Sequence, residues 1–404
     1  MRLNLKVSVF TALFSIGLLG AGTQLWAQTG RIEKEYPAEY GLRDVIIERA
    51  DPSLCPQYFV YAGRAVPVDD SGRKTIIWHT SEDLLLAPGR NLTGVFSPGA
   101  APTRADEPQL YDFRVFDSGG QEIFKLSGML LNISERPFYF LTDSKLAIIT
   151  CSYWGDELHF YDRRGQLLNE RHFLQEGTLS LINPKGVFDE SGHLFLFNLS
   201  RAREEEEKVG PDLFMFSANG ARIWQYQLPL KSTDAIGLSP SGKIAAVSGT
   251  IINPKPPQPT FQTILFDSLG NILNSFPVIF RCCDFDRNDQ WLLLGGNYKA
   301  SLISLIKKSI YLELTPGSGQ RVITDCALLT GNRILILTGL ESSRNGESLY
   351  DDPGILIYSP EGQLLFRQIF ESDYTFCGNL ILNDTRDRFG ITLQNRFVVF
   401  GVNP

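Results

Sequence analysis

Apolar residues along the chain occur in short runs separated by polar turns, a spacing typical of β-strands rather than helices. In the clearest pattern, an apolar run ends in an aromatic residue, often followed by aspartate, and leads through a turn with glycine to a second apolar run. The five copies are RVFDSGGQEIF from Arg114, HFYDRRGQLL from His159, FMFSANGARIW from Phe214, ILFDSLGNIL from Ile264 and ILIYSPEGQLLF from Ile355. Glycine supplies the positive φ of a tight hairpin, so each copy predicts a β-hairpin. A degenerate copy, SLISLIKKSIYLEL from Ser301, falls between the fourth and fifth.

A second hairpin pattern alternates with the first. Its clearest copies are GVFDESGHLFLFN from Gly186, AIGLSPSGKIAAVSG from Ala235 and CDFDRNDQWLLLGG from Cys283. Two successive hairpins make one four-stranded antiparallel unit, and a repeat of roughly 50 residues is the signature of propeller blades. The pattern predicts an all-β protein with a β-propeller of seven four-stranded blades; six or eight blades are the alternatives. The seven inner strands are expected to begin near Lys74, Phe138, Gly186, Ala235, Cys283, Ala327 and Asn379.

The two ends of the chain are expected to meet in the last blade. Only three apolar runs follow Asn379 before the chain stops, so that blade lacks a strand. Tyr58 to Tyr61 is expected to supply it, because an N-terminal strand that closes the last blade removes the exposed edges at the seam. The segment from Tyr40 to Ala50 is the one expected helix.

The blade pattern of Ala235 to Gly249 followed by Ile264 to Leu273 resembles that of WD-repeat and YVTN-type β-propellers. The resemblance extends over nearly the whole chain after the N-terminal segment and implies a propeller fold. It assigns no specific family within that superfamily.

The N-terminal residues indicate export. Arg2 and Lys6 flank an apolar run from Val7 to Leu19, and small residues lead to Ala27, as in a cleaved signal peptide. We therefore expect a signal peptide at residues 1–27, an N-terminal extension at 28–57 and a single propeller domain at 58–404, with a periplasmic or secreted location. A retained N-terminal anchor is the alternative. No later apolar run approaches the roughly 20 residues of a membrane-spanning helix, so no span is expected after cleavage.

The net charge and the motifs of the chain limit the kinds of partner and site that we expect. The formal net charge is −7 and no basic stripe occurs, which argues against nucleic acid. No catalytic, cofactor-binding or metal-binding residues are assigned, and no cofactor is expected. The four histidines form no HExxH pair. Asp284, Asp286 and Asn288 match the start of a calcium loop, but the same segment is an ordinary hairpin turn.

Three of the expected inner strands begin with cysteine, in RCCDF, TDCALL and TFCGNL. Because equivalent positions of neighbouring blades lie at one end of the central channel, we predict a disulfide between blades. The candidates are Cys282, Cys283, Cys326 and Cys377, with Cys326 paired to Cys282 or Cys283 most favoured. Disulfides persist in exported proteins. Unpaired, buried thiols are the alternative.

The connections between the second and third strands emerge on one face of a propeller. Four of them are expected to be long loops, at Pro88 to Gln109, Arg201 to Asp212, Gly249 to Thr260 and Gly339 to Pro353. Loops on a rigid scaffold commonly carry function, so the sequence predicts a non-enzymatic scaffold that binds a protein or small ligand of the cell envelope through this face. The alternative is an enzyme, such as a hydrolase, lactonase or lyase, acting on an exported small molecule or glycan at the central channel.

Overall fold

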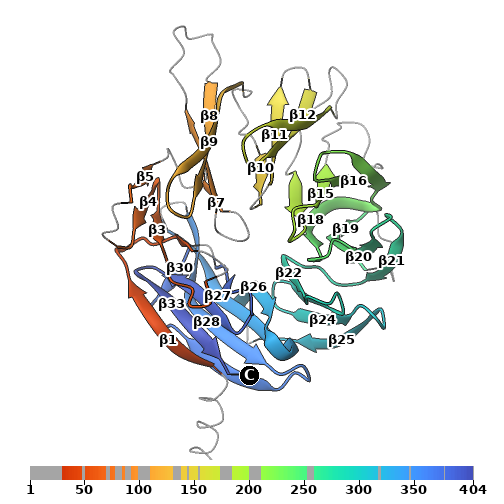
Figure 1. Cartoon of the computed structure of the whole chain (residues 1–404). Coiled ribbons are helices and arrows are strands. Elements are labelled where there is room, and N and C mark those ends of the chain that lie inside the picture. Colours follow the sequence, from red (N-terminus) through yellow and green to blue (C-terminus); the bar gives the residue numbers. More distant parts are fainter. Residues whose placement is uncertain are drawn as a thin grey trace, which may run out of the picture.

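The repeated hairpins fold into a ring of twisted antiparallel sheets (Figure 1). The computed structural model describes residues 30–47, 51–69, 73–77, 84–86, 92–98, 110–130, 138–142, 145–152, 155–172, 184–199, 211–252, 259–316, 320–344, 347–376 and 378–403. Within these ranges, every sheet is built from strands that follow one another in the sequence, except the sheet that joins the two ends of the chain.

The first four sheets in chain order contain strands β2 to β17. They are β2 (Asp44–Ile46), β3 (Tyr58–Tyr61), β4 (Arg64–Pro67) and β5 (Ile76–Ile77); β6 (Leu84–Leu86), β7 (Leu92–Pro98), β8 (Leu110–Asp117) and β9 (Glu122–Leu130); β10 (Phe138–Leu141), β11 (Lys145–Ser152), β12 (Gly155–Asp162) and β13 (Leu167–His172); and β14 (Lys185–Phe188), β15 (Leu194–Leu199), β16 (Asp212–Ser217) and β17 (Arg222–Gln227).

The other four sheets contain the remaining strands. They are β18 (Leu230–Leu238), β19 (Ile244–Ile251), β20 (Phe261–Asp267) and β21 (Ile272–Phe276); β22 (Cys282–Phe285), β23 (Trp291–Gly295), β24 (Ala300–Ser304) and β25 (Ser309–Leu314); β26 (Arg321–Leu328), β27 (Ile334–Arg344), β28 (Glu347–Tyr358) and β29 (Leu364–Ile369), with β30 (Tyr374–Thr375) added to β28; and β31 (Ile381–Leu382), β32 (Arg388–Leu393), β33 (Arg396–Val402) and β1 (Gly30–Pro37).

The described residues form eight blades, so the predicted count of seven is wrong. The count is one too low because the first two blades are predicted as one, with an inner strand near Lys74. In the structure, Tyr58–Tyr61 is β3 of the first blade, and its inner neighbour β2 lies within the predicted helix from Tyr40 to Ala50. The inner strand of the second blade is β6. Because β2, β5 and β6 contain only two or three residues each, none is long enough to show the alternation that identifies a strand in a sequence.

An N-terminal strand does close the ring, but it is β1 rather than Tyr58–Tyr61. β1 pairs antiparallel with β33 from Gly30↔Val402 to Pro37↔Arg396, with a bulge between Ile32 and Lys34. The carboxylate of Glu33, within this bulge, accepts a hydrogen bond from Arg388 Nε at 2.6 Å. Residues 30–37 and 44–46, in the expected N-terminal extension, therefore supply strands to the last and the first blade.

The five predicted turn glycines all adopt positive φ: Gly120, Gly165, Gly220, Gly270 and Gly362. Three residues before each glycine, an aspartate or serine side chain accepts the backbone N–H of the residue after the glycine. Examples are Asp267 Oδ1 with Asn271 N at 2.8 Å and Ser359 Oγ with Gln363 N at 3.2 Å. The degenerate turn is also present, with Lys308 at φ 51°. The aspartate and glycine of the repeat are thus explained by turn geometry.

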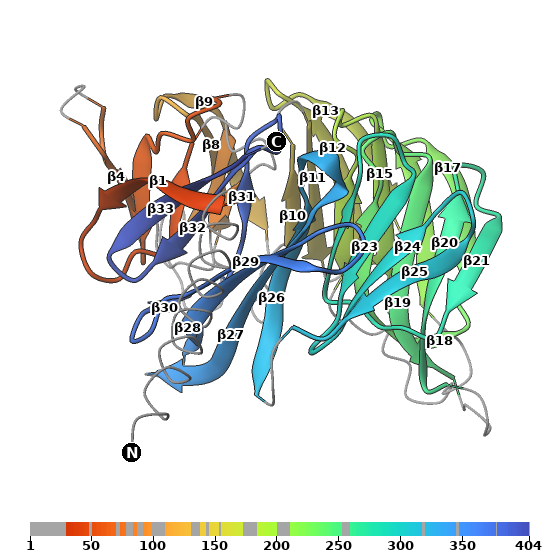
Figure 2. The ribbon, with the colours of Figure 1, turned by 90° about the horizontal axis from the view of Figure 1, so that it is seen from below.

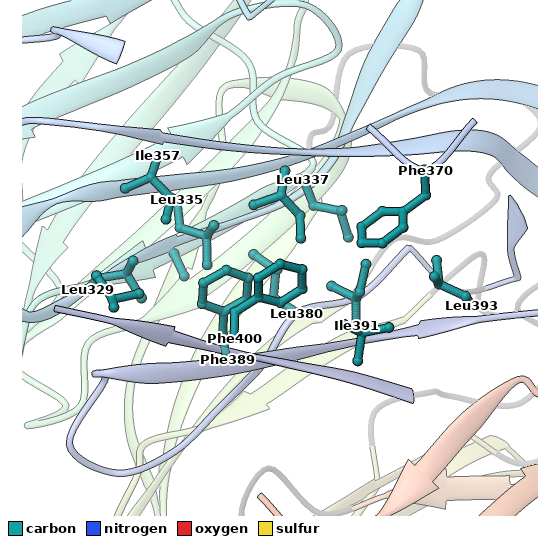
Figure 3. Close-up of a cluster of buried hydrophobic side chains, with 14 residues drawn as sticks. Leu329, Leu335, Leu337, Ile357, Phe370, Leu380, Phe389, Ile391, Leu393 and Phe400 are labelled. Atoms are coloured by element: carbon teal, nitrogen blue, oxygen red, sulfur yellow. The ribbon is translucent and has the colours of Figure 1, made fainter. Parts of the chain in front are cut away.

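Apolar side chains fill the spaces between blades rather than one central core. Figure 3 shows such a layer between the last two blades, where Phe389 and Phe400 stack with ring centroids 4.9 Å apart. Phe366 and Phe370, from the β29 side, meet the ring of Phe400 edge-on at 6.3 and 6.2 Å. Each blade therefore depends on its neighbours for burial, as expected of a repeat fold.

Candidate functional site

Two carboxylates on the inner strands, Asp284 and Asp325, bind the next blade. Asp284, on β22, accepts the backbone N–H of Leu328 on β26 at 2.7 Å and also pairs with Arg386, whose Nη2 lies 3.1 Å from Asp284 Oδ1. Asp325, on β26, accepts the N–H of Leu380, just before β31, at 2.8 Å. These two side chains connect three successive blades. Asp286, from the same calcium-like segment as Asp284, caps its own turn by accepting Trp291 N at 2.6 Å.

Opposite charges also lie on the neighbouring inner strands β14 and β18, at Lys185 and Asp234. Burial raises the pKa of Asp234, and the positive charge of Lys185 lowers it in part. The inner-strand charges of neighbouring blades are thus placed to interact with each other.

The structure brings Cys282 of β22 next to Cys326 of β26, with their Sγ atoms 3.4 Å apart. Cys283 points to the other side of its blade, where its sulfur occupies the space that a Cβ at Gly237 would need. Cys377 lies outside the described residues. The thiols of Cys282, Cys283 and Cys326 are unpaired in the structure, and the predicted disulfide stays a prediction, with Cys282 the nearer partner of Cys326.

The buried thiols are poor nucleophiles. Burial raises the pKa of Cys283, and the hydrogen bond with Cys282, together with burial, raises the pKa of Cys326. Since the thiolate is the reactive form, neither group is activated at neutral pH.

The segment from Gly339 to Pro353, expected to be a long loop, is instead an extended hairpin. β27 and β28 continue their pairing from Leu340↔Asp351 to Arg344↔Glu347, and β30 adds a third strand through Tyr350↔Thr375 and Asp351↔Tyr374. Figure 2 shows β28 and β30 together at the lower left of the molecule. The backbone of this projection is therefore held by ladder hydrogen bonds.

Ionic and aromatic contacts fix the hairpin to the first residues of the ring. Arg43 donates from Nη2 to both carboxylate oxygens of Glu347, at 2.6 and 2.7 Å, and its guanidinium lies 4.7 Å from the ring centroid of Phe376. Arg344 lies at the same distance from the ring centroid of Tyr374 and pairs with Asp351 at 2.7 Å. Arg43 thus holds the hairpin at Glu347, and Arg344 holds it at Tyr374.

Two exposed tyrosines flank this hairpin. Tyr40 is 70% exposed and meets the ring of Tyr374 edge-on at 6.0 Å. Tyr298 is 52% exposed, and its loop is tied to β26 by the Ile323 N–H, which donates to Asn297 O at 2.7 Å.

Arg281 connects the Tyr298 loop to the hairpin. It donates to Asn297 Oδ1 at 3.3 Å and lies 4.0 Å from Glu341. We call the surface formed by Tyr40, Arg281, Tyr298, Glu341 and Arg344, which extends over both sides of the projecting hairpin, the hairpin face.

The other three predicted loops are only partly described. The segment from Pro88 to Gln109 contains β7, so it is not a continuous loop. Residues 201–210 and 253–258 of the second and third loops lie outside the described residues.

No sequence pattern indicates the residues that brace the hairpin. Arg43 and Glu347 are separated by 304 positions, and no motif connects them. The extended parts of β27 and β28 are mostly polar, so no alternation of apolar residues indicates strands there.

Comparison with known proteins supports the architecture and no closer relationship. No family model and no curated protein sequence matches the chain. The C-terminal WD40 domain of Sif2 superimposes with a TM-score of 0.54 at 9% sequence identity, covering 93% of this chain and 99% of that one. The chain has a WD-repeat-like β-propeller fold. The Dos1 propeller is also similar to this propeller, with a TM-score of 0.50 and 12% identity, covering 80% and 78% of the two chains.

A search of the described part of the propeller for membrane spans finds no helix with the length and apolar character needed to cross a bilayer.

Proposed function

We propose that this chain is an exported, non-enzymatic propeller that binds a partner protein in the cell envelope through the hairpin face. The observation that carries the proposal is the extended β27–β28 hairpin, which is braced by Arg43 and flanked by exposed Tyr40 and Tyr298. The signal-peptide-like residues 1–27 support the location.

The composition of the hairpin face suits a protein interface. Tyrosine and arginine are enriched in the residues that contribute most binding energy, because they combine a large apolar surface with polar atoms. A face held by ladder hydrogen bonds and ion pairs loses little conformational entropy on binding, so more of the contact energy appears as affinity. The WD-repeat-like scaffold fits protein binding in general.

Photocrosslinking from the hairpin face should capture one partner. We expect a benzophenone-bearing phenylalanine at Tyr40 or Tyr298 to crosslink to the same envelope protein in intact cells, because both side chains flank the β27–β28 hairpin. Mass spectrometry of the crosslinked species is the measurement.

Leu269 is the matched control position. It is 73% exposed and lies in the turn between β20 and β21, whereas Tyr298 lies at the opposite end of the strands, between β23 and β24. The proposal would be contradicted if Leu269 crosslinked to the same protein in equal yield. It would also be contradicted if Tyr40 and Tyr298 crosslinked to different proteins.

Export is tested separately. The full chain should be recovered outside the cytoplasm with an N-terminus at or near Gln28, whereas a variant lacking residues 2–27 should remain in the cytoplasm, because the charged and apolar regions of the signal are gone. Cell fractionation and N-terminal sequencing measure both. A full-length protein that keeps Met1 would disprove cleavage.

A further inference from the structure

The outer strands of the third blade carry the same short pattern twice. β12 contains Glu157-Leu158-His159 and β13 contains Glu170-Arg171-His172, so two of the four histidines in the chain occur in these strands. The antiparallel register pairs Glu157 with His172 and His159 with Glu170. Because side chains two positions apart share one face of a strand, all four lie on the same face of the sheet, with glutamate and histidine at alternate corners.

The opposite face of these strands is used for packing. Leu158 is fully buried in the layer against the fourth blade. Asn169 and Arg171 bind the turn of that blade, through Asn169 Nδ2 to Asn219 O at 2.9 Å and Arg171 Nε to Gly220 O at 2.8 Å. Contacts with the fourth blade therefore fix both strands through this face. The glutamates and histidines on the other face take no part in those contacts.

The donor atoms of Glu157, His159 and Glu170 all lie within 4.8 Å of one another. His159 Nε2 is 3.3 Å from Glu157 Oε2 and 3.7 Å from Glu170 Oε2. Metal–ligand bonds of about 2.0–2.2 Å place neighbouring donors of a tetrahedral zinc site roughly 3.4 Å apart. The observed separations match that spacing.

The Nε2 atom of His159 lies between the carboxylates of Glu157 and Glu170. His159 Nε2 is buried, yet among the described residues no group forms a hydrogen bond with it. The two carboxylates contact this nitrogen as ion-pair neighbours without a hydrogen bond, and coordination to a metal ion would give the buried nitrogen a direct bond. Two facing carboxylates supply two negative charges, which a divalent cation balances.

His172 stands beside the three donors. Its Nδ1 lies 3.3 Å from Glu157 Oε1 and its Nε2 lies 2.7 Å from Glu170 Oε1. Its side chain is 63% exposed, so it can adjust more freely than His159, which makes it the natural fourth ligand.

We propose that Glu157, His159, Glu170 and His172 form a binding site for a divalent transition-metal ion, with zinc the best fit. Imidazole is a borderline donor that suits zinc, and zinc also accepts carboxylate oxygens beside it, whereas magnesium and calcium prefer oxygen ligands alone. The site does not match the HExxH motif, whose two histidines lie on one helix. Here each of two neighbouring strands supplies one glutamate and one histidine, two positions apart.

Metal titration of the chain from Gln28 to Pro404, with any histidine tag removed, tests the site. Isothermal calorimetry after chelator treatment should show one Zn²⁺ ion bound per chain and no comparable binding of Mg²⁺. Co²⁺ should give the visible absorption of a four-coordinate ion. Absence of Zn²⁺ binding, or an octahedral Co²⁺ spectrum, would overturn the proposal.

Variants assign the ligands. His159→Ala should weaken Zn²⁺ binding by about 100-fold or more, since replacing even an outer-shell partner costs 10–100-fold. His172→Ala should have a smaller effect than His159→Ala. His193→Ala is the matched control, because that histidine lies in the turn of another blade beside Ser191, 2.9 Å away.

Unfolding of the metal-free variants shows whether they fold. All should unfold cooperatively near the temperature of the metal-free parent, and Zn²⁺ should raise the Tm of the parent and of His193→Ala but not of His159→Ala. If His159→Ala folds and binds Zn²⁺ like the parent, or if His193→Ala alone loses binding, the proposed site is wrong.

Discussion

Removal of β1 should abolish the cooperative unfolding of the propeller. We expect a chain that begins at Ala38 to aggregate or to unfold without a sharp transition, a loss comparable with the whole net stability of a folded domain, about 5–15 kcal/mol. Without Gly30–Pro37, the entire length of β33 becomes an exposed edge, which invites aggregation. The deletion also removes Tyr36, which is 8% exposed and stacks on Phe397 at 6.3 Å.

Two controls separate loss of β1 from a general effect of truncation. A chain that begins at Gly30 should keep the thermal transition of the longer chain. A synthetic peptide of residues 28–37, added to the chain from Ala38, should restore part of the transition by strand addition. Circular dichroism and calorimetry measure both. A sharp transition at the parental temperature without residues 30–37 would show that the ring does not depend on β1.

Phe400→Ala should lower the free energy of unfolding by about 3–5 kcal/mol, the usual cost of deleting a buried phenylalanine side chain. Phe400 is fully buried, and its ring contacts Phe389 and Phe370 in the layer between the last two blades (Figure 3). The ring of Phe366 on β29 also meets it edge-on. The substitution therefore leaves a cavity among three aromatic rings.

Phe400→Leu is the matched control, because it keeps an apolar side chain of similar size and should cost less than Phe400→Ala. A second control is Ile32→Ala, the cross-strand neighbour of Phe400 on β1, which is 42% exposed and should change stability by about 0.5 kcal/mol or less. Urea titration followed by tryptophan fluorescence gives all three values. Equal losses for Phe400→Ala and Ile32→Ala would show that this layer contributes little.

Both stability predictions concern the last blade, in which the two ends of the chain meet. There the local sequence pattern does not identify the strand that closes the ring. The missing fourth strand of the last blade predicts closure by an N-terminal strand, but the prediction that Tyr58–Tyr61 supplies it is wrong. β1 reads GRIEKEYP and is mostly exposed, so nothing in its composition indicates a strand. It forms because β33 offers an unpaired edge and because Glu33 reaches Arg388, 355 positions away.

The sequence by itself determined that this protein is a β-propeller built from repeated hairpins. It also determined that the turn glycines of these hairpins adopt positive φ. Period-two alternation and turn chemistry are local properties, so they can be recognised without knowing any distant contact. The aspartate and glycine of the repeat, such as Asp267 and Gly270, act within one turn.

Only the tertiary structure decided the number of blades, the strand that closes the ring, the approach of Cys282 to Cys326, the extension of β27 and β28, and the Glu–His cluster of the third blade. Each depends on contacts between strands or blades. Strands of two or three residues, such as β5 and β6, carry too little pattern to be recognised alone and are held in place by their neighbours. The number of blades is a property of the assembled ring, whereas the candidate metal site depends on the register of β12 against β13 within one blade.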